Sequence, residues 1–393
     1  MSDRGGAWLE AAENALRAAP PEALLPTARK LLATQVQARY VTLLLADYGL
    51  TELHPVTTPT HTTHTIALRD GAPAARAFVA GATTLEADVA GTVTLHLPVA
   101  VRGDRLGVLS VNLPKPSLGL TTVMELRSFA TAMGHELVIA DRHTDLYLRA
   151  RRRQRLTLAA EMQWQLLPGR GFVRDEYTLG AHVEPAYAVG GDNFDWSTSD
   201  DHLTITVTNG SGHGLAAALL TNLTVSALRN ARRAGVSLAD QACLADQAIY
   251  GEYSGRRCSP TLLLRFNLAT GQASVVDAGS PQLFRLRNGT VERVDLEAQL
   301  PLGMFEETDY REQPLGVAVN DRLVIATSGP HSTRTPGADG PGEDALLATI
   351  VATRDASPHE AARILVEQLM RVADDEDLPG DAAVVCLDWR GRA

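Results

Sequence analysis

Two glycine-rich segments contain the residues best suited to chemistry. The first is Gly190-Gly191-Asp192, and the second runs from Asn209 to Gly214 and includes Gly210 and His213. The second segment follows an expected strand at 203–208 and leads directly into an expected helix at 215–232. A glycine-rich turn between a strand and a helix lets backbone groups approach an anion or a metal without side-chain obstruction. Each segment alone is weak evidence, because an aspartate after two glycines is most often a turn former.

Taken together, the segments resemble a known pattern. Gly-Gly-Asp followed by Gly-x-Gly-His-Gly-x-x-Ala-Ala-x-Leu resembles the SpoIIE-like branch of the type 2C (PPM) metal-dependent protein serine/threonine phosphatases. Three further matches follow the family's order: Gln163 to Pro168, Asp277 to Pro281, and Pro301 to Met304. The resemblance covers about residues 158–390, and five ordered motifs make it specific.

The resemblance implies a two-metal site. In this family, aspartates hold two divalent cations, manganese or magnesium, and a bridging water attacks phosphoserine or phosphothreonine. Hard dications prefer oxygen ligands, and both metals are needed to lower the pKa of that water. By this alignment the catalytic positions are Asp192 and Asn209. The metal positions, with the degenerate ones and one possible substitute, are Asp192, Asn209, Gly210, Ser328, Gly380 and Asp381.

The aligned positions lack most of the expected negative charge. Asp192 keeps its carboxylate and Gly210 can offer its carbonyl, but Asn209 is a neutral ligand, and Ser328 and Gly380 replace aspartates. Asp381 can substitute only if its loop shifts by one residue, because successive side chains entering a strand point to opposite faces. Loss of even an outer partner of a metal lowers affinity or activity about 10–100-fold. We therefore expect weak or absent catalysis and weakened binding of manganese or magnesium.

Other acidic residues are alternative donors. They are Asp195, Asp200, Asp201 and the run Asp374 to Asp377, and we expect solvated loops for all except Asp195. The histidine of the family's Ala-Gly-His is Ser280 here. His213 is expected to pack at a helix start rather than bind a metal.

The pattern of elements predicts two domains of the α+β class. Strands outnumber helices in the second half, and several are linked as hairpins, which favours a sandwich over a doubly wound sheet; the resemblance specifies an α-β-β-α sandwich. The hairpin at 97–111 resembles that of a GAF sensor domain. The expected organisation is an N-terminal helical segment (1–22), a GAF-like domain (23–140), an Arg-rich linker helix (141–168) and a phosphatase domain (169–393).

Composition excludes several functions. The formal net charge is −10 over 393 residues, which offers no general attraction for nucleic acid or an anionic membrane. The three cysteines lack the spacing of a zinc site or a disulfide framework. The N-terminus lacks a signal-peptide pattern, and no apolar run approaches the ~20 residues that span a bilayer. We expect a cytoplasmic protein.

Three functional hypotheses remain. The first is a phosphatase, regulated by the GAF-like domain through the Arg-rich helix and acting on a phosphoprotein such as an anti-sigma-factor antagonist. The second is a pseudophosphatase that binds or switches such a partner without hydrolysis. The third is a sensor whose C-terminal domain mainly provides a dimer surface. The ligand of the GAF-like domain is unknown, and the linker helix allows a homodimer.

Overall fold

A computed structural model describes residues 3–56, 64–87, 91–184, 190–279, 281–327, 341–375 and 381–392. Ser280, Ser328 and Gly380 lie outside these ranges, as do Glu376 and Asp377 of the acidic run. The chain divides into two compact units, residues 1–155 and 156–393, which are described separately. Among the described helices, none is both long and apolar enough to span a membrane.

Unit 1 contains five α-helices, three short 3-10 helices and a six-stranded sheet among its described residues. In chain order its elements are α1 (Asp3–Ala18), η1 (Pro21–Ala23), α2 (Leu24–Val36), β1 (Tyr40–Ala46), β2 (Glu52–Pro55), β3 (Ile66–Ala67), η2 (Leu68–Asp70), α3 (Pro73–Ala80), β4 (Thr84–Ala87), β5 (Thr92–Val101), β6 (Asp104–Pro114), η3 (Lys115–Ser117), α4 (Leu120–Ala140) and α5 (Leu146–Ala150).

The sheet of unit 1 is antiparallel, with the order β3-β2-β1-β6-β5-β4. The predicted hairpin is present as β5 and β6, joined at Arg102 and Gly103, which both have positive φ as a tight hairpin turn requires. Apolar residues of β1, β5 and β6 pack against α1, α2 and α4 on one face. The N-terminal helix, expected as a segment of its own at 1–22, is therefore part of this core, with Leu16 fully buried. The GAF-like assignment stays a prediction.

The linker expected as one helix over 141–168 is interrupted twice. Helix α4 ends at Ala140, α5 covers Leu146–Ala150, and α6 begins only at Leu158. One arginine of the Arg-rich stretch packs against residues at the end of β1. The guanidinium of Arg151 lies 5.1 Å from the ring centroid of Tyr48, and its Nε donates to the carbonyl of Ala46 at 3.1 Å. These contacts tie the end of α5 to unit 1.

Unit 2 contains two sheets and five α-helices among its described residues. In chain order its elements are α6 (Leu158–Leu166), β7 (Gly171–Val173), β8 (Tyr177–Glu184), β9 (Asn193–Thr198), β10 (His202–Thr208), α7 (Gly214–Arg233), α8 (Leu238–Tyr253), β11 (Thr261–Asn267), β12 (Ala273–Ala278), β13 (Gln282–Arg287), β14 (Thr290–Arg293), β15 (Gln313–Leu315), β16 (Arg322–Ala326), α9 (Pro341–Ala352), α10 (Pro358–Asp375) and β17 (Ala382–Trp389).

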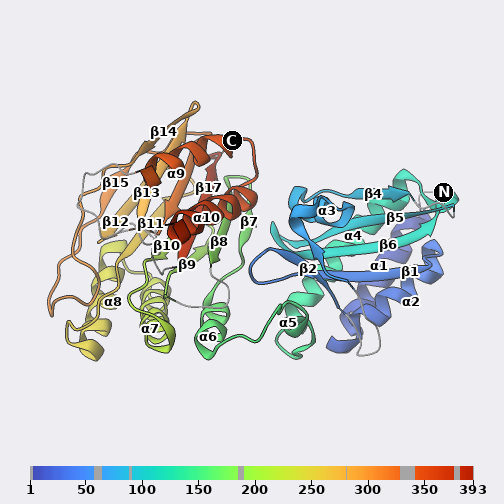
Figure 1. Ribbon diagram of the computed structural model, residues 1–393, viewed down its shortest axis with the longest axis horizontal. Coiled ribbons are helices and arrows are strands. Elements are labelled where there is room, and N and C mark those ends of the chain that lie inside the picture. The colour runs from blue at the N-terminus through green and yellow to red at the C-terminus, as the bar shows by residue number, and fades with distance from the viewer. Residues whose placement is uncertain are drawn as a thin grey trace. The chain divides into compact units, whose positions relative to one another are not determined.

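The two sheets of unit 2 pack face to face between helices. One has the order β15-β12-β11-β10-β9 and the other β14-β13-β16-β17-β8-β7. Alternate residues of the strands form the core between the sheets, while the opposite faces pack against α7 and α8 on one side and α9 and α10 on the other (Figure 1). This period of two is what a sheet buried on both faces requires. The predicted α-β-β-α sandwich is confirmed.

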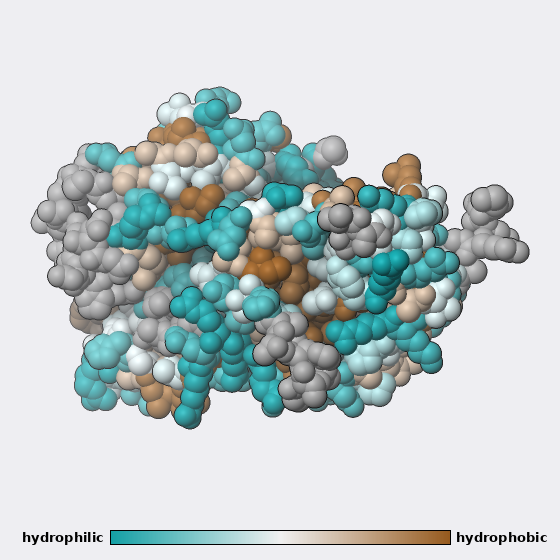
Figure 2. All heavy atoms as spheres, turned by 45° about the vertical axis from the view of Figure 1, so that its right-hand side comes forward, coloured by the Kyte–Doolittle hydropathy of each residue, from teal (hydrophilic) through white to brown (hydrophobic). Residues whose placement is uncertain are grey.

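One face of the molecule carries mostly polar side chains among its described residues. The face shown in Figure 2 is predominantly hydrophilic, with small apolar patches between the charged and polar side chains. This distribution agrees with the net charge of −10 and a charged fraction of 21%.

Candidate functional site

Four polar residues lie at one end of the two sheets of unit 2. Each stands at or next to a strand terminus, two positions from a residue of the core between the sheets: Asp192, Asn209, Thr327 and Asp381. Because side chains alternate along a strand, all four are directed to the inner side. The strands are antiparallel neighbours in their sheets, so the end of one lies beside the start of the next. The topology thus brings together residues separated by up to 189 positions.

Asp192 is buried, with 3% of its surface exposed. Its Oδ1 accepts a hydrogen bond from the backbone N–H of Gly210 at 2.6 Å. The two loops touch so closely that a Cβ on Gly210 would lie 2.3 Å from the carbonyl oxygen of Gly190, so only glycine fits there. Within the described part of the chain, the buried Oδ2 of Asp192 has no hydrogen-bond partner. Gly210, predicted to offer a carbonyl to a metal, thus uses its N–H to hold the aspartate.

Asp381 lies against the loop that carries Asp192. Its Oδ2 accepts hydrogen bonds from three consecutive backbone amides, those of Gly190 at 2.5 Å, Gly191 at 2.8 Å and Asp192 at 3.3 Å. Such a run of amides forms an anion-binding concavity. A Cβ on Gly190 would lie 2.1 Å from Oδ1 of Asp381, which explains the first glycine of the motif. The structure therefore places Asp381 beside Asp192, but with one oxygen already occupied by backbone donors.

Burial raises the cost of ionising both carboxyl groups, and the charge of Asp381 adds to that cost at Asp192. Burial, followed by the charge of Asp381, raises the pKa of Asp192 well above its usual value, while the Thr327 hydroxyl and the Gly210 N–H act in the opposite direction. Burial raises the pKa of Asp381 to about 6, against the lowering effect of the three amides. Both groups therefore favour the neutral form more than an exposed aspartate does. A cation beside Asp192 would reverse that preference.

The donor set does not fit a centre for two metal ions. In the described ranges, no three His, Cys, Asp or Glu side chains come close enough together to hold a metal. Ser328 and Gly380, at the positions aligned with family aspartates, have no carboxylate whatever their placement. Among the described residues, the site has one carboxylate with a free oxygen, Asp192, and one bound to amides, Asp381. The half-buried Asn209 can add only a neutral oxygen.

Helices α6 and α7 hold the backbone of the Asp192 loop. Gln163 of α6, 5% exposed, donates from Nε2 to the carbonyl of Asp192 at 2.7 Å. Thr221 of α7 donates its hydroxyl to the carbonyl of Gly191 at 2.7 Å. The sequence placed Gln163 in a motif without indicating this contact. The available signal in the sequence was a glutamine at helical spacing from the alanines and leucine that the helix buries.

Asp195 is not available as a metal ligand. Its Oδ1 accepts from Arg229 at 2.7 Å and its Oδ2 from Arg232 at 2.9 Å, both on α7, and the carboxylate is 2% exposed. The same Arg229 side chain donates to the carbonyl of Leu166 at the end of α6. This expectation is corrected: Asp195 anchors α6 and α7 to the sheet. Asp200 and Asp201 are exposed, as predicted.

His213 precedes α7 and is exposed, so it does not pack at the helix start as predicted.

The glycines of the two remaining motifs serve packing. Gly279 has φ +78°, and a Cβ there would lie 2.7 Å from Cγ of Pro301, which joins two of the predicted motifs. Gly303 has φ +82°, and its N–H donates to Asp246 at 2.6 Å. These contacts assign both motifs to shaping the sandwich.

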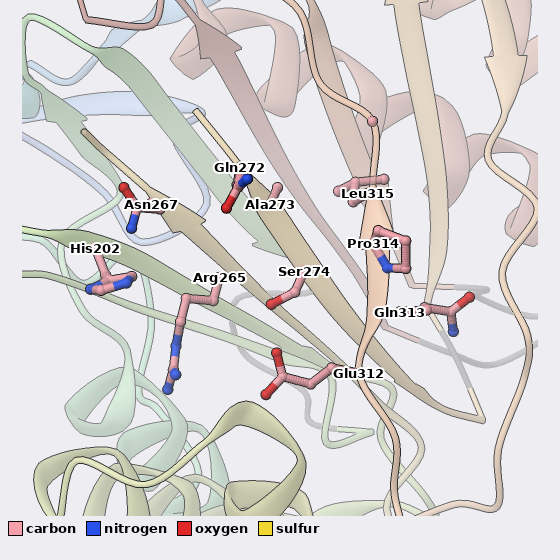
Figure 3. Close-up of a pocket in the computed structure, with 11 residues that line it drawn as sticks. His202, Arg265, Asn267, Gln272, Ala273, Ser274, Glu312, Gln313, Pro314 and Leu315 are labelled. Atoms are coloured by element: carbon pink, nitrogen blue, oxygen red, sulfur yellow. The ribbon is translucent and has the colours of Figure 1, made fainter. Parts of the chain in front are cut away.

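A separate hollow of about 600 Å³ lies over strands β11, β12 and β15 (Figure 3). None of the predicted site residues lines it. Its charged side chains already have structural partners. Arg265 donates to the carbonyl of Val236 at 3.1 Å, and Glu312 accepts from the first amides of α8, including that of Leu238 at 2.8 Å. We assign these residues to fixing the turn between α7 and α8.

Comparison with known families decides the classification. Residues 199–390 match the family model described as Stage II sporulation protein E (SpoIIE). Unit 2 therefore contains a SpoIIE-like domain. The resemblance drawn from the ordered motifs is thus confirmed at the level of the family. No curated protein sequence matches the chain significantly.

Solved structures similar to unit 2 share little sequence with it. The RsbU and RsbW domains of Rv1364c from Mycobacterium tuberculosis match at 18% identity over 56% of this chain and 62% of that one, with a TM-score of 0.47. The phosphatase domain and a regulatory fragment of SpoIIE from Bacillus subtilis match at 17% over 56% and 64%, with a TM-score of 0.48. The SiaA-PP2C domain of Pseudomonas aeruginosa matches at 21% over 59% and 94%, with a TM-score of 0.48. The match thus spans less than two thirds of the first two structures.

Proposed function

We propose that unit 2 recognises a phosphoserine- or phosphothreonine-containing protein and hydrolyses it weakly or not at all. The observation that supports this most is the state of the two remaining carboxylates. Asp381 is held by three amides, and only Asp192 has a buried oxygen without a partner in the described residues. A pair of dications needs several anionic oxygens to be held together. The unit keeps the family's scaffold and lacks the charge for its two-metal chemistry.

A second candidate is a slow phosphatase that works with one cation. The Oδ2 atom of Asp192, which has no hydrogen-bond partner among the described residues, favours this second candidate. A single cation there would bind this oxygen and offset the cost of burying the negative charge of Asp192. Manganese or magnesium bound at Asp192 and Asn209 would supply charge neutralisation to a phosphoryl group. The protein residues would contribute orientation: Gly210 fixes the Asp192 carboxyl, and Gln163 and Thr221 fix its backbone.

The partner and regulation complete the proposal. A phosphorylated regulator, such as an anti-sigma-factor antagonist, is the expected partner. This partner rests on the family resemblance of the ordered motifs alone. The GAF-like domain would modulate the interaction in response to a ligand. A homodimer through the region of α5 and α6 is part of the same proposal.

One experiment separates the two candidates. The purified chain is titrated with manganese by calorimetry, and phosphate release from a phosphoserine peptide is followed over the same range. Absent or millimolar binding without turnover supports the binding module. Metal-dependent turnover that disappears in Asp192→Ala supports the phosphatase and rejects the binding module. Asp201→Ala, which removes an exposed carboxylate of the β9–β10 loop, is the matched control.

A further inference from the structure

We propose that Arg257 is the residue of unit 2 that binds the phosphoryl group of a phosphorylated protein partner. The proposal rests on the function proposed above and names the side chain that would carry recognition. Arg257 belongs to none of the motifs that identify the family resemblance. It lies between helix α8 and strand β11, on the connection that passes the glycine-rich loop at 209–213.

Arg257 lies over the loop that holds Asp192. Gly210 donates to Asp192, and two residues farther along, a Cβ on Gly212 would lie 3.5 Å from Nη1 of Arg257. Consecutive Cα atoms are 3.8 Å apart, so the Cα atoms of Gly210 and Gly212 lie within about 7.6 Å of each other. The guanidinium therefore borders the same short loop as the candidate site. The exposed Gly212 leaves space beside it that a larger residue would fill.

The segment carrying Arg257 is fixed on both sides. Ser254 ends α8 in the left-handed conformation, and its N–H donates to the carbonyl of Tyr250 at 2.6 Å. On the other side, the N–H of Ser259 donates to the carbonyl of Leu302 at 2.8 Å. A side chain between two such anchor points loses less conformational freedom when it binds a ligand. Arg257 itself is half-buried.

Within the described ranges, Arg257 makes no hydrogen bond or ion pair. Other arginines of the unit do: Arg229 and Arg232 bind Asp195, and Arg322 binds Asp388. An arginine left without an acidic partner beside a glycine-rich loop is suited to an external anion. Its planar guanidinium matches a phosphate with two parallel hydrogen bonds. A phosphorylated serine or threonine carries a charge of about −1.5 to −2 at pH 7, which such a group complements.

Exposed apolar side chains near Arg257 favour a phosphorylated polypeptide over free phosphate. Leu215, three residues beyond Gly212, is 46% exposed, and Phe305 is 52% exposed. Met304, next to Phe305, is close to this segment, because a Cβ on Gly255 would lie 2.9 Å from the Met304 carbonyl oxygen. Apolar groups beside a phosphate-binding side chain can contact the residues that flank a phosphorylated one.

The test measures binding in the presence of EDTA, so it does not depend on metal or turnover. A blocked phosphoserine peptide, the same peptide without phosphate, and inorganic phosphate are titrated against the full chain by calorimetry. Arg257→Ala should weaken binding of the phosphopeptide about 10- to 100-fold, the loss expected for hydrogen bonds between charged groups. Arg257→Lys should fall between Arg257→Ala and the parent. Arg256→Ala, which removes the adjacent exposed arginine, should bind within about twofold of the parent.

Each result has a distinct meaning. Equal affinity of Arg257→Ala and Arg256→Ala would overturn the role of Arg257 while leaving phosphoprotein binding intact. Equal affinity for inorganic phosphate and phosphopeptide would overturn recognition of a phosphorylated protein at this residue. Absence of any phosphate-dependent binding by the parent chain would overturn both this inference and the proposed function. Circular dichroism of both variants confirms that they fold.

Discussion

Replacing Asp381 tests whether its carboxylate is a structural acceptor for the Asp192 loop. Asp381→Ala removes the acceptor of three backbone amides, two of which are bound at 2.5 and 2.8 Å. A buried donor left without a partner costs about 1–3 kcal/mol. Two such donors give about 2–6 kcal/mol, and relief of the repulsion with Asp192 offsets part of it. We expect a net loss of about 2–4 kcal/mol in the free energy of unfolding of unit 2.

Asp381→Asn is the matched variant. Its side-chain oxygen can still accept the amide hydrogen bonds, and it carries no charge that burial disfavours. The expected change is within about 1 kcal/mol of the parent. Urea unfolding followed by tryptophan fluorescence reports on the right unit, because three of the four tryptophans, Trp164, Trp196 and Trp389, lie in residues 156–393.

The urea midpoints of Asp381→Ala and Asp381→Asn distinguish the outcomes. With an m-value of about 2–3 kcal/mol/M, the expected loss in Asp381→Ala moves the urea midpoint down by about 1 M. An unchanged midpoint in Asp381→Ala, or an equal loss in Asp381→Asn, would refute the assignment of Asp381 as the acceptor for this loop.

Three further predictions concern other groups. Burial raises the pKa of Asp141 to about 6, so the folded protein favours the protonated carboxyl, and its contribution to stability is present below about pH 4 and lost as pH rises through 6. The free energy of unfolding of Asp141→Asn, measured for unit 1 with urea, should therefore exceed that of the parent by about 1–3 kcal/mol at pH 8 but not at pH 4. The same difference in free energy of unfolding at both pH values would contradict this. Asp195→Ala should lower the free energy of unfolding by about 3–5 kcal/mol, because Arg229 and Arg232 both lose their acidic partner. Thermal unfolding, with Asp200→Ala as control, checks this. Gly180→Ala should destabilise unit 2 by more than about 2 kcal/mol, because a Cβ there would lie 2.2 Å from the backbone nitrogen of His359, and a melting temperature equal to that of the parent would show that α10 can move away.

The sandwich was predictable because its signals are local. Strand periodicity, glycine-rich turns and ordered motifs each occupy a short stretch, and the inner and outer faces follow from alternation alone. Alternation alone did not place Asp381 beside Asp192, because the motif alignment assigned that position to Gly380. That Asp381 binds the amides of the Asp192 loop depends on a contact between residues 189 apart. Sequence spacing does not specify such a contact.

Two expectations were wrong because tertiary packing decides them. The helical pattern over 141–168 contains no proline before Pro168, yet the structure interrupts it around residues 141–145 and 151–157, where Arg151 turns back to Tyr48. Asp195 was a reasonable metal donor by residue type. Its neighbours on α7, Arg229 and Arg232, are more than 30 positions away in sequence and satisfy both of its oxygens.

The most direct test of the central claim restores the missing charge. Calorimetric titration with manganese compares the parent chain with Asn209→Asp, Ser328→Asp and Gly380→Asp combined, and Asp192→Ala in that background serves as control. We expect absent or millimolar binding by the parent, and binding at least 10–100-fold tighter by the triple variant that Asp192→Ala abolishes. Micromolar binding of two manganese ions by the parent chain would contradict the account.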